Sequence, residues 1–365
     1  MERLEGLRAR TPQMLDDLAM LVWAESPTDD VAATTACADV VAELGSRLLG
    51  REPERVVVDG HTHLRWGTGG VLLIGHFDTV WPVGTAARWP FAVDGDTATG
   101  PGCFDMKAGI VQGLHALDEI GRPRGVSVLL TCDEEIGSPT SEEVIAQTAS
   151  DARAVLVLEP SERGALKVAR KGVARYRVIV RGKASHAGLD PYGGRNALVE
   201  LAHQVLAIDG LADRDAGTSV VPTTSAAGTT NNTVPERAWA EVNVRAWTSD
   251  ELDRVLDDLR GLRPHIDGTS VEIEVGLVRP PLERTASADL FALAAKLADE
   301  IGIGPLEGAE VGGGSDGNLT AAMGVPTLDG LGAVGGGAHA EGEHIVVPAM
   351  AERAALVAAL VGELV

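Results

Sequence analysis

Three short and predominantly apolar segments constrain the fold of this chain more than any other feature of its sequence. They are Val71–Ile74, Val126–Thr131 and Ala154–Leu158. Apolar segments of this length are typical of strands that are buried on both faces, as in parallel sheets. Helical patterns over 105–120 and 141–149 separate them. This alternation predicts an α/β domain in which a mostly parallel sheet lies between helices.

The pattern changes between about residue 170 and residue 277, which indicates a second domain. Helical patterns at 196–209 and 250–261 accompany three segments that alternate apolar and polar residues, as strands with one exposed face do. These segments are Ala174–Arg181, Trp239–Arg245 and Val271–Val275. The length of 365 residues also exceeds the roughly 250–300 residues that one core usually serves. We therefore expect a discontinuous catalytic domain, residues 1–170 and 278–365, and an inserted α+β sandwich, residues 171–277, that serves dimerisation or acts as a lid.

Charge and composition exclude several classes of function. The chain has 53 acidic and 31 basic residues, a formal net charge of −22, which argues against a nucleic-acid partner. Its three cysteines have no CxxC spacing, which favours a reducing compartment over a disulfide framework. The N-terminal segment lacks the apolar core of a signal peptide, and no segment has the composition of a membrane span. We expect a soluble, cytoplasmic protein without a membrane partner.

Residues with metal-binding side chains follow the predicted buried strands. His76 follows the first strand, the acids Asp133–Glu135 follow the second, and Glu159 follows the third. Ligands of such sheets bind beyond the carboxyl ends of the strands, so these side chains are expected to meet at one edge. Crowded acids repel each other unless cations compensate them. Within the pair Glu134 and Glu135, one can ligate a metal while the other takes the proton of the attacking water. A solvated turn is the alternative.

Two aspartates have specific expected roles. Asp78 stands two residues after His76, on the same face of an extended chain, and could fix the histidine tautomer by accepting its second ring proton. A capping aspartate beside a core histidine is the alternative. Asp105 lies in the glycine-bracketed segment Gly100–Gly109, where a carboxylate could bridge two cations. The alternative for Asp105 is a helix N-cap.

A late histidine completes the set. His339 follows Gly335–Gly337 after a single alanine, and we prefer it to the nearby His344 as a ligand. A serine nucleophile is not expected. Gly312–Gly314 is not followed by GKS or GKT, so a nucleotide site is not expected either. Imidazole and carboxylate ligands suit two divalent ions, and zinc, cobalt and manganese are all suitable. The predicted ligands are His76, Asp105, Glu135, Glu159 and His339, with Glu134 as the base.

The motifs around these residues resemble those of a known family. This is the family of co-catalytic zinc metallopeptidases that includes glutamate carboxypeptidase (carboxypeptidase G type), aminoacylase and succinyl-diaminopimelate desuccinylase. The resemblance extends from about Val71 to Ile345 and is greatest to the glutamate carboxypeptidase branch. The motifs that carry it are GHFDTVWP, GPGCFDMKAG, CDEEIGS, LEPS, GKASHAG, NNTVPERA, NVRA, GGGSDGN and GAHAEGEH.

The resemblance implies a division of roles among the ligands. His76 and Glu159 would hold one zinc ion, and Glu135 and His339 would hold the other. Asp105 would bridge the two ions, and the family often has a cis peptide bond after this aspartate, here Asp105-Met106. The resemblance further implies that Glu134 acts as general base and acid and that Asp78 orients His76.

The resemblance also assigns residues of the smaller domain to the substrate. His186 would polarise the scissile carbonyl, typically from the partner subunit of a homodimer. Asn232 and Arg245 would bind the free carboxylate of the substrate. The remaining predicted substrate-binding residues are Gly314, Ser315 and Lys171.

From these expectations we predict that the protein hydrolyses an N-acyl amino acid or a C-terminal peptide bond. An acidic amino acid such as glutamate is the favoured product. One alternative is an aminoacylase or desuccinylase with a different side-chain selectivity. The other is a metal-binding dimeric scaffold without turnover. The substrate would be a small molecule or peptide with a free carboxylate, and the exposed sheet of the smaller domain favours pairing with a second copy.

Overall fold

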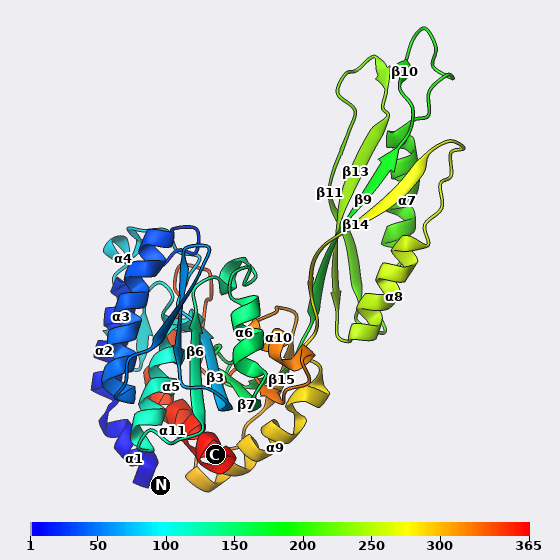
Figure 1. Ribbon diagram of the computed structural model, residues 1–365. Coiled ribbons are helices and arrows are strands. Elements are labelled where there is room, and N and C mark those ends of the chain that lie inside the picture. The colour runs from blue at the N-terminus through cyan, green and yellow to red at the C-terminus, as the bar shows by residue number, and fades with distance from the viewer. Residues whose placement is uncertain (1) are drawn as a thin grey trace. The chain divides into compact units, whose positions relative to one another are not determined.

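The computed structural model describes residues 2–365, which divide into two compact units (Figure 1). Unit 1 comprises the chain up to Ala169, Leu282–Val311 and Ser315–Val365. Unit 2 comprises Arg170–Pro281 and Gly312–Gly314. None of the helices in the described part of the chain is both long enough and apolar enough to cross a membrane.

A six-stranded sheet forms the centre of unit 1. Its strand order is β1-β2-β6-β3-β7-β16, and the four strands from β6 to β16 run parallel, whereas β1 and β2 pair antiparallel with their neighbours. The predicted mostly parallel sheet is therefore confirmed. The bounds are β1 Glu54–Val58, β2 His61–Trp66, β3 Gly70–His76, β6 Val126–Thr131, β7 Ala152–Val157 and β16 Thr327–Leu328.

Helices cover both faces of this sheet, as the apolar strands predict. Along β3, Leu73 packs into a core cluster with α2, α3, α5 and α11, whereas Leu72 and Ile74 pack into a second cluster with α6. In Figure 1, α2 and α3 lie on one side of the strands and α6 lies on the other. The helix bounds are α1 Glu2–Ala9, α2 Thr11–Trp23, α3 Val31–Leu49, α4 Thr85–Arg88, α5 Ala108–Glu119, α6 Glu142–Ala149, α9 Arg284–Ile301, α10 Asp316–Ala322 and α11 Val347–Leu364.

Two small sheets complete unit 1. The order β17-β18-β5-β4 joins the glycine-rich late segment to the segment before Asp105. A two-stranded pair joins β8 to β15. The bounds are β4 Ala92–Asp94, β5 Thr97–Thr99, β8 Leu166–Arg170, β15 Gly308–Val311, β17 Gly335–Gly336 and β18 His344–Val346.

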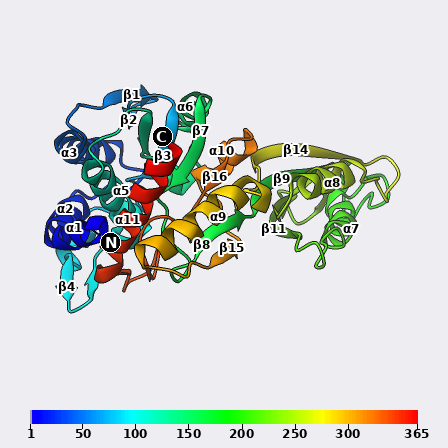
Figure 2. The ribbon, with the colours of Figure 1, turned by 90° about the horizontal axis from the view of Figure 1, so that it is seen from below.

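Unit 2 is an antiparallel sheet with helices on one face. The strand order is β11-β13-β9-β14, and α7 and α8 pack against one side of it (Figure 2). A short pair, β10 and β12, extends beyond this sheet. This is the predicted second, antiparallel layer of an α+β domain. The bounds are β9 Gly172–Arg181, β10 Ser185–His186, α7 Ala197–Asp209, β11 Ser219–Ala227, β12 Thr233–Val234, β13 Arg237–Ala246, α8 Ser249–Arg260 and β14 Ser270–Arg279.

The packing of α3 on β2 yields a stability prediction. A Cβ added at Gly45 would lie 2.3 Å from Cζ2 of the buried Trp66, so Gly45→Ala forces the indole ring to move and should cost about 1–3 kcal/mol in the free energy of unfolding. The matched control is Gly362→Ala in α11, where an added Cβ meets nothing within 4 Å. It should not lower stability, because alanine favours helix more than glycine does. Urea unfolding followed by circular dichroism measures both, and equal stabilities of the two variants would contradict the packing argument.

Candidate metal centre and active site

The predicted ligands come from segments far apart in the sequence, and most follow strands of the central sheet. His76 is the last residue of β3, and Glu159 follows β7. Glu134 and Glu135 open a short helical turn after β6. Helix α5 begins at Ala108 with Lys107 as its N-cap, so Asp105 does not cap this helix and the N-cap alternative is wrong. The peptide bond Asp105-Met106 is cis, as the resemblance implies.

Asp105 lies between the two histidines. Its Oδ1 is 3.4 Å from Nε2 of His76, and its Oδ2 is 3.3 Å from Nε2 of His339. His76 Nε2 is also 3.4 Å from Glu159 Oε1, and His339 Nε2 is 3.0 Å from Glu135 Oε2. Each imidazole therefore has one further carboxylate in addition to the shared one. This is the grouping that the motifs imply. His344 makes none of these contacts, and its Nδ1 lies 2.9 Å from the carbonyl oxygen of Gly342.

The arrangement fits divalent cations. Ligand atoms of His76, Asp105 and Glu135 lie within 4.8 Å of one another, as do those of His76, Glu134 and Glu159. Oδ1 of Asp105 is buried and accepts no hydrogen bond from any residue in 2–365. A buried carboxylate oxygen without a donor is costly, and a cation held between Asp105 and His76 would remove that cost.

The electrostatics of the site favour positive charge. Contacts with Asp105 and Glu135 raise the pKa of His339 to about 10. Burial alone would lower the pKa of His76, but Asp105, Asp78 and Glu159 outweigh it and hold the pKa well above the usual value. Burial would raise the pKa of Asp105, but the contacts with His339 and His76 outweigh it and lower the pKa. The carboxylates of the cluster thus favour positive charge at this point, and metal ions would supply such charge.

Asp78 connects His76 to the acidic pair. Nδ1 of His76 lies 3.1 Å from the Asp78 carbonyl oxygen and 3.3 Å from its Oδ1, so Asp78 can fix the ring as predicted. The backbone N–H groups of Glu134 and Glu135 donate to the same carboxylate at 3.3 and 3.2 Å. Thr28 donates a third hydrogen bond at 2.7 Å. One buried carboxylate therefore positions both His76 and the candidate base.

In unit 2, the histidine predicted to act on the carbonyl has a defined tautomer. Nδ1 of His186 accepts hydrogen bonds from the backbone N–H groups of Gly188 and Leu189 at 3.1 and 3.0 Å. The neutral ring therefore carries its proton on Nε2, where it can be donated to a substrate oxygen. The backbone of Ala187 donates to the carbonyl of Asn232 at 2.9 Å, so the structure brings His186 and Asn232 together.

Arg245 lies at the other end of the same sheet. It pairs in register with Val173, whereas Arg237, which is close in sequence to Asn232, pairs with Arg181. The strand between Arg237 and Arg245 is about 27 Å long at about 3.4 Å per residue. Within one chain, Asn232 and Arg245 therefore do not reach a common carboxylate. A carboxylate bound by both residues would need Asn232 and Arg245 from different copies of the chain.

Comparison with known proteins identifies the family. The model of Peptidase family M20/M25/M40 matches residues 72–363. Carboxypeptidase G2 from Pseudomonas sp. (strain RS-16) is 33% identical over 374 residues, which cover 97% of this chain and 89% of that protein. The chain belongs to peptidase family M20/M25/M40. The resemblance seen in the motifs is confirmed, and the chain is a metallohydrolase of this family.

Other M20 relatives agree with this assignment. Succinyl-diaminopimelate desuccinylase from Paracoccus denitrificans is 30% identical over 63% of this chain and 72% of that protein. Among solved structures, aminopeptidase PepT from Bacillus cereus superposes with a TM-score of 0.74 at 22% identity, covering 97% of this chain and 98% of that chain. An M20 family metallo-carboxypeptidase from Sulfolobus solfataricus gives 0.66 at 17% identity, covering 95% and 98%. These structures share the fold.

Two predicted substrate-binding side chains of this M20 member are already engaged in the fold. Ser315 is fully buried, and its hydroxyl donates to Asp329 Oδ2 at 2.6 Å and accepts from Gly317 N–H as the N-cap of α10. The hydroxyl of Ser315 is therefore already used within unit 1. Lys171 donates to the carbonyl of Gly217 and lies 5.0 Å from the ring centroid of Trp247. The carbonyl of Gly314 accepts from Arg170 at 3.1 Å.

The sequence motifs did not identify Glu343, which connects the loops of the candidate metal site. Glu343 is fully buried and accepts hydrogen bonds from the backbone N–H groups of Gly102, Phe104 and Asp105 at 2.8–2.9 Å. It also accepts one from Nε1 of Trp81 at 2.9 Å. The loops that carry His76, Asp105 and His339 are thus joined through one carboxylate. The GAHAEGEH motif contains this glutamate, but nothing in the motif distinguishes it from the exposed Glu341.

Replacing Glu343 should weaken metal binding without touching a ligand. In Glu343→Gln the amide N–H₂ would face backbone donors, so the Asp105 loop should shift and zinc affinity should fall about 10- to 100-fold. Trp81→Phe, which removes one of the donors, should cause a smaller loss in the same direction. Zinc affinity is measured by competition with a chromogenic chelator.

The control for this experiment is Glu341→Gln, because Glu341 is exposed and lies in the same loop. It should bind zinc like the wild type. Wild-type affinity in Glu343→Gln would show that the loop geometry does not depend on this carboxylate.

Proposed function

We propose that this M20 member hydrolyses the amide bond of an N-acyl amino acid or the last peptide bond of a peptide, and that it releases an acidic amino acid such as glutamate. The observation that carries the proposal is the Asp105 carboxylate in contact with both His76 and His339, with the Glu134 carboxylate in the same cluster. The similarity to a protein named carboxypeptidase G2 supports the carboxypeptidase reaction.

The residues present fit two divalent ions, with zinc as the first choice. His76 and Glu159 would hold one ion, Glu135 and His339 the other, and Asp105 both. Such a pair lowers the pKa of a shared water and polarises the substrate carbonyl.

Glu134 is the proposed general base. Its backbone N–H is held by Asp78, which places the side chain beside His76 and Glu159. The carboxylate would take a proton from the attacking water and later deliver it to the leaving amine, as a base with access to both atoms can do. Its neighbour Glu135 contacts His339 and is proposed as a ligand instead.

Unit 2 supplies the proposed contacts to the substrate. The Nε2–H of His186 would donate to the scissile carbonyl oxygen, with Asn232 beside it. Arg245, whose guanidinium has no carboxylate partner among residues 2–365, would bind the free carboxylate. His186 and Arg245 lie at opposite ends of the sheet, which supports a homodimer in which His186 and Asn232 complete the site of the other copy.

One alternative within the family has specific support. The similarity to a protein named succinyl-diaminopimelate desuccinylase favours an aminoacylase or desuccinylase with a different side-chain preference. A panel of acylated glutamate, alanine and diaminopimelate, assayed with one acyl group at a time, separates these reactions by kcat/KM.

The free and buried cysteines Cys37, Cys103 and Cys132 support a reducing compartment, and we propose the cytoplasm.

The role of Glu134 is tested by a substitution that keeps its shape. Glu134→Gln should lower kcat about 100- to 10,000-fold while both metal ions remain bound, because the base is lost and the ligands are intact. The control is Glu142→Gln, an exposed glutamate at the start of α6, which should keep wild-type kcat. Glu134→Gln with full metal content and near-wild-type kcat would disprove the mechanism.

The proposal that His186 acts in the active site of the other copy is tested by combining two inactive variants. Chains with Glu134→Gln and chains with His186→Ala should each be inactive alone. Co-expressed in equal amounts they should recover roughly a quarter of wild-type activity, because half of the random pairs are mixed and each mixed pair holds one complete site. Mixed dimers, seen by native mass spectrometry, that stay inactive would rule out action in trans.

A further inference from the structure

Two arginines on the helix-free face of the unit 2 sheet lack a counter-charge. The chain has 53 acidic and only 31 basic residues, yet within residues 2–365 no carboxylate lies at ion-pair distance from Arg175 or Arg245. Two other arginines of this face, both on β9, are paired. Arg177 contacts Glu241 at 2.5 Å, and Arg181 contacts Glu272 at 3.1 Å. In so acidic a protein, two neighbouring unpaired guanidinium groups indicate a place for an external anion.

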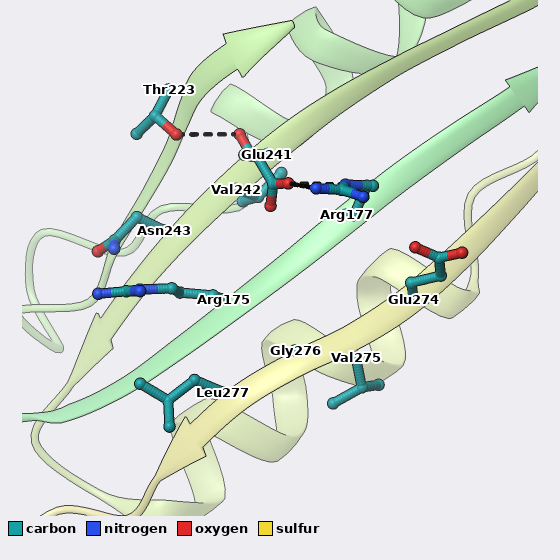
Figure 3. A pocket seen from close by; sticks show the side chains of 10 residues that line it. All are labelled: Arg175, Arg177, Thr223, Glu241, Val242, Asn243, Glu274, Val275, Gly276 and Leu277. Atoms are coloured by element: carbon teal, nitrogen blue, oxygen red, sulfur yellow. Dashed lines mark hydrogen bonds and ion pairs between the residues drawn. The ribbon is translucent and has the colours of Figure 1, made fainter. Parts of the chain in front are cut away.

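The strand register brings these two arginines together. Arg175 on β9 is directly opposite Asn243 on β13, and Arg245 is two residues further along β13 on the same face. Such diagonal positions are about 7–8 Å apart in antiparallel sheets, which long side chains can span. Figure 3 shows Arg175 and Asn243 side by side in a hollow of about 600 Å³ on this face.

Asn243 contributes a neutral group between the two charges. Its Oδ1 accepts a hydrogen bond from Nε of Arg245 at 3.3 Å, which directs the amide N–H₂ away from Arg245 and leaves it available as a donor. Partial burial, and secondarily the positive charge of Arg175, lower the pKa of Arg245 from its usual value. An anion between the two guanidinium groups would relieve this repulsion.

At the other end of the hollow the charges are already balanced. Arg177 and Glu241 form an ion pair there, and Figure 3 shows Glu274 pointing away from Arg175. The hydroxyl of Thr223 donates to the backbone of Glu241 at 3.4 Å. The donors that remain for an external ligand therefore gather at Arg175, Asn243 and Arg245.

We propose that Arg175, together with the Asn243 amide, binds the side-chain carboxylate of an acidic amino acid whose main-chain carboxylate is bound by Arg245. This inference rests on the proposed function and names the residues that would select the acidic product. Two guanidinium groups at diagonal positions suit two carboxylates joined by a short aliphatic chain, as in glutamate, and each can bind one carboxylate through a pair of hydrogen bonds. Leu277, which lines the hollow next to Arg175, would contact that aliphatic chain.

Kinetics with a matched pair of substrates test the proposal. In Arg175→Gln, kcat/KM for N-benzoyl-L-glutamate should fall about 10- to 100-fold, mainly through KM, because a charged hydrogen-bond partner is lost. The value for N-benzoyl-L-alanine should change less than about two-fold, because this substrate lacks the second carboxylate. The control is Arg181→Gln on the same strand and face, whose arginine is paired with Glu272. It should leave both values unchanged.

Calorimetry separates failure of this inference from failure of the proposed reaction. The full-length wild-type protein should bind glutarate more tightly than butyrate, Arg175→Gln should lose that preference, and Arg181→Gln should keep it. If the wild type hydrolyses neither substrate but shows this pattern, the hydrolase proposal fails and the dicarboxylate site stands. Equal binding of glutarate and butyrate by the wild type, or an unchanged preference in Arg175→Gln, would overturn the inference.

Discussion

The contact of one carboxylate, Asp105, with both His76 and His339 is the interaction on which the rest of the site depends. It requires loops more than 200 residues apart in sequence to meet at one point, and it concentrates negative charge where little water can compensate it. The fold meets this requirement with further buried carboxylates. Asp78 holds the acidic pair beside His76, and Glu343 holds the backbone of the Asp105 loop. Both carboxylates accept hydrogen bonds from at least two N–H groups, and these bonds offset the free-energy cost of burying the carboxylates.

The central sheet explains the position of the cluster around Asp105. Parallel strands deliver their carboxyl ends to one edge, so His76, Glu134 and Glu159 converge without long loops. Unit 2 has a different design, because its helices cover only one face of the sheet and leave charged residues on the other. That division suits a protein in which unit 1 carries metal chemistry and unit 2 carries recognition of the substrate.

The sequence allowed the parallel sheet, the antiparallel second unit and the convergence of the ligands to be predicted, because each depends on local patterns at strand ends. Glu343 escaped prediction because its partners lie about 240 residues away, and no local pattern distinguishes it from the exposed Glu341. Arg175 was not predicted as a substrate-binding residue. Its place beside Arg245 depends on strand register, and its lack of a carboxylate partner depends on which neighbours are already paired. The separation of Asn232 from Arg245 within one chain also depends on strand register, so no local pattern reveals it.

The central claim is that the Asp105 cluster binds two divalent ions and that they enable amide hydrolysis. Its most direct test is a zinc titration of chelator-treated protein, in which calorimetry counts the bound ions while hydrolysis of N-benzoyl-L-glutamate is followed in parallel. The account predicts two ions per chain and hydrolysis that appears as the sites fill. Hydrolysis at full rate in the metal-free protein, or two bound ions without hydrolysis of any acyl amino acid, would contradict it.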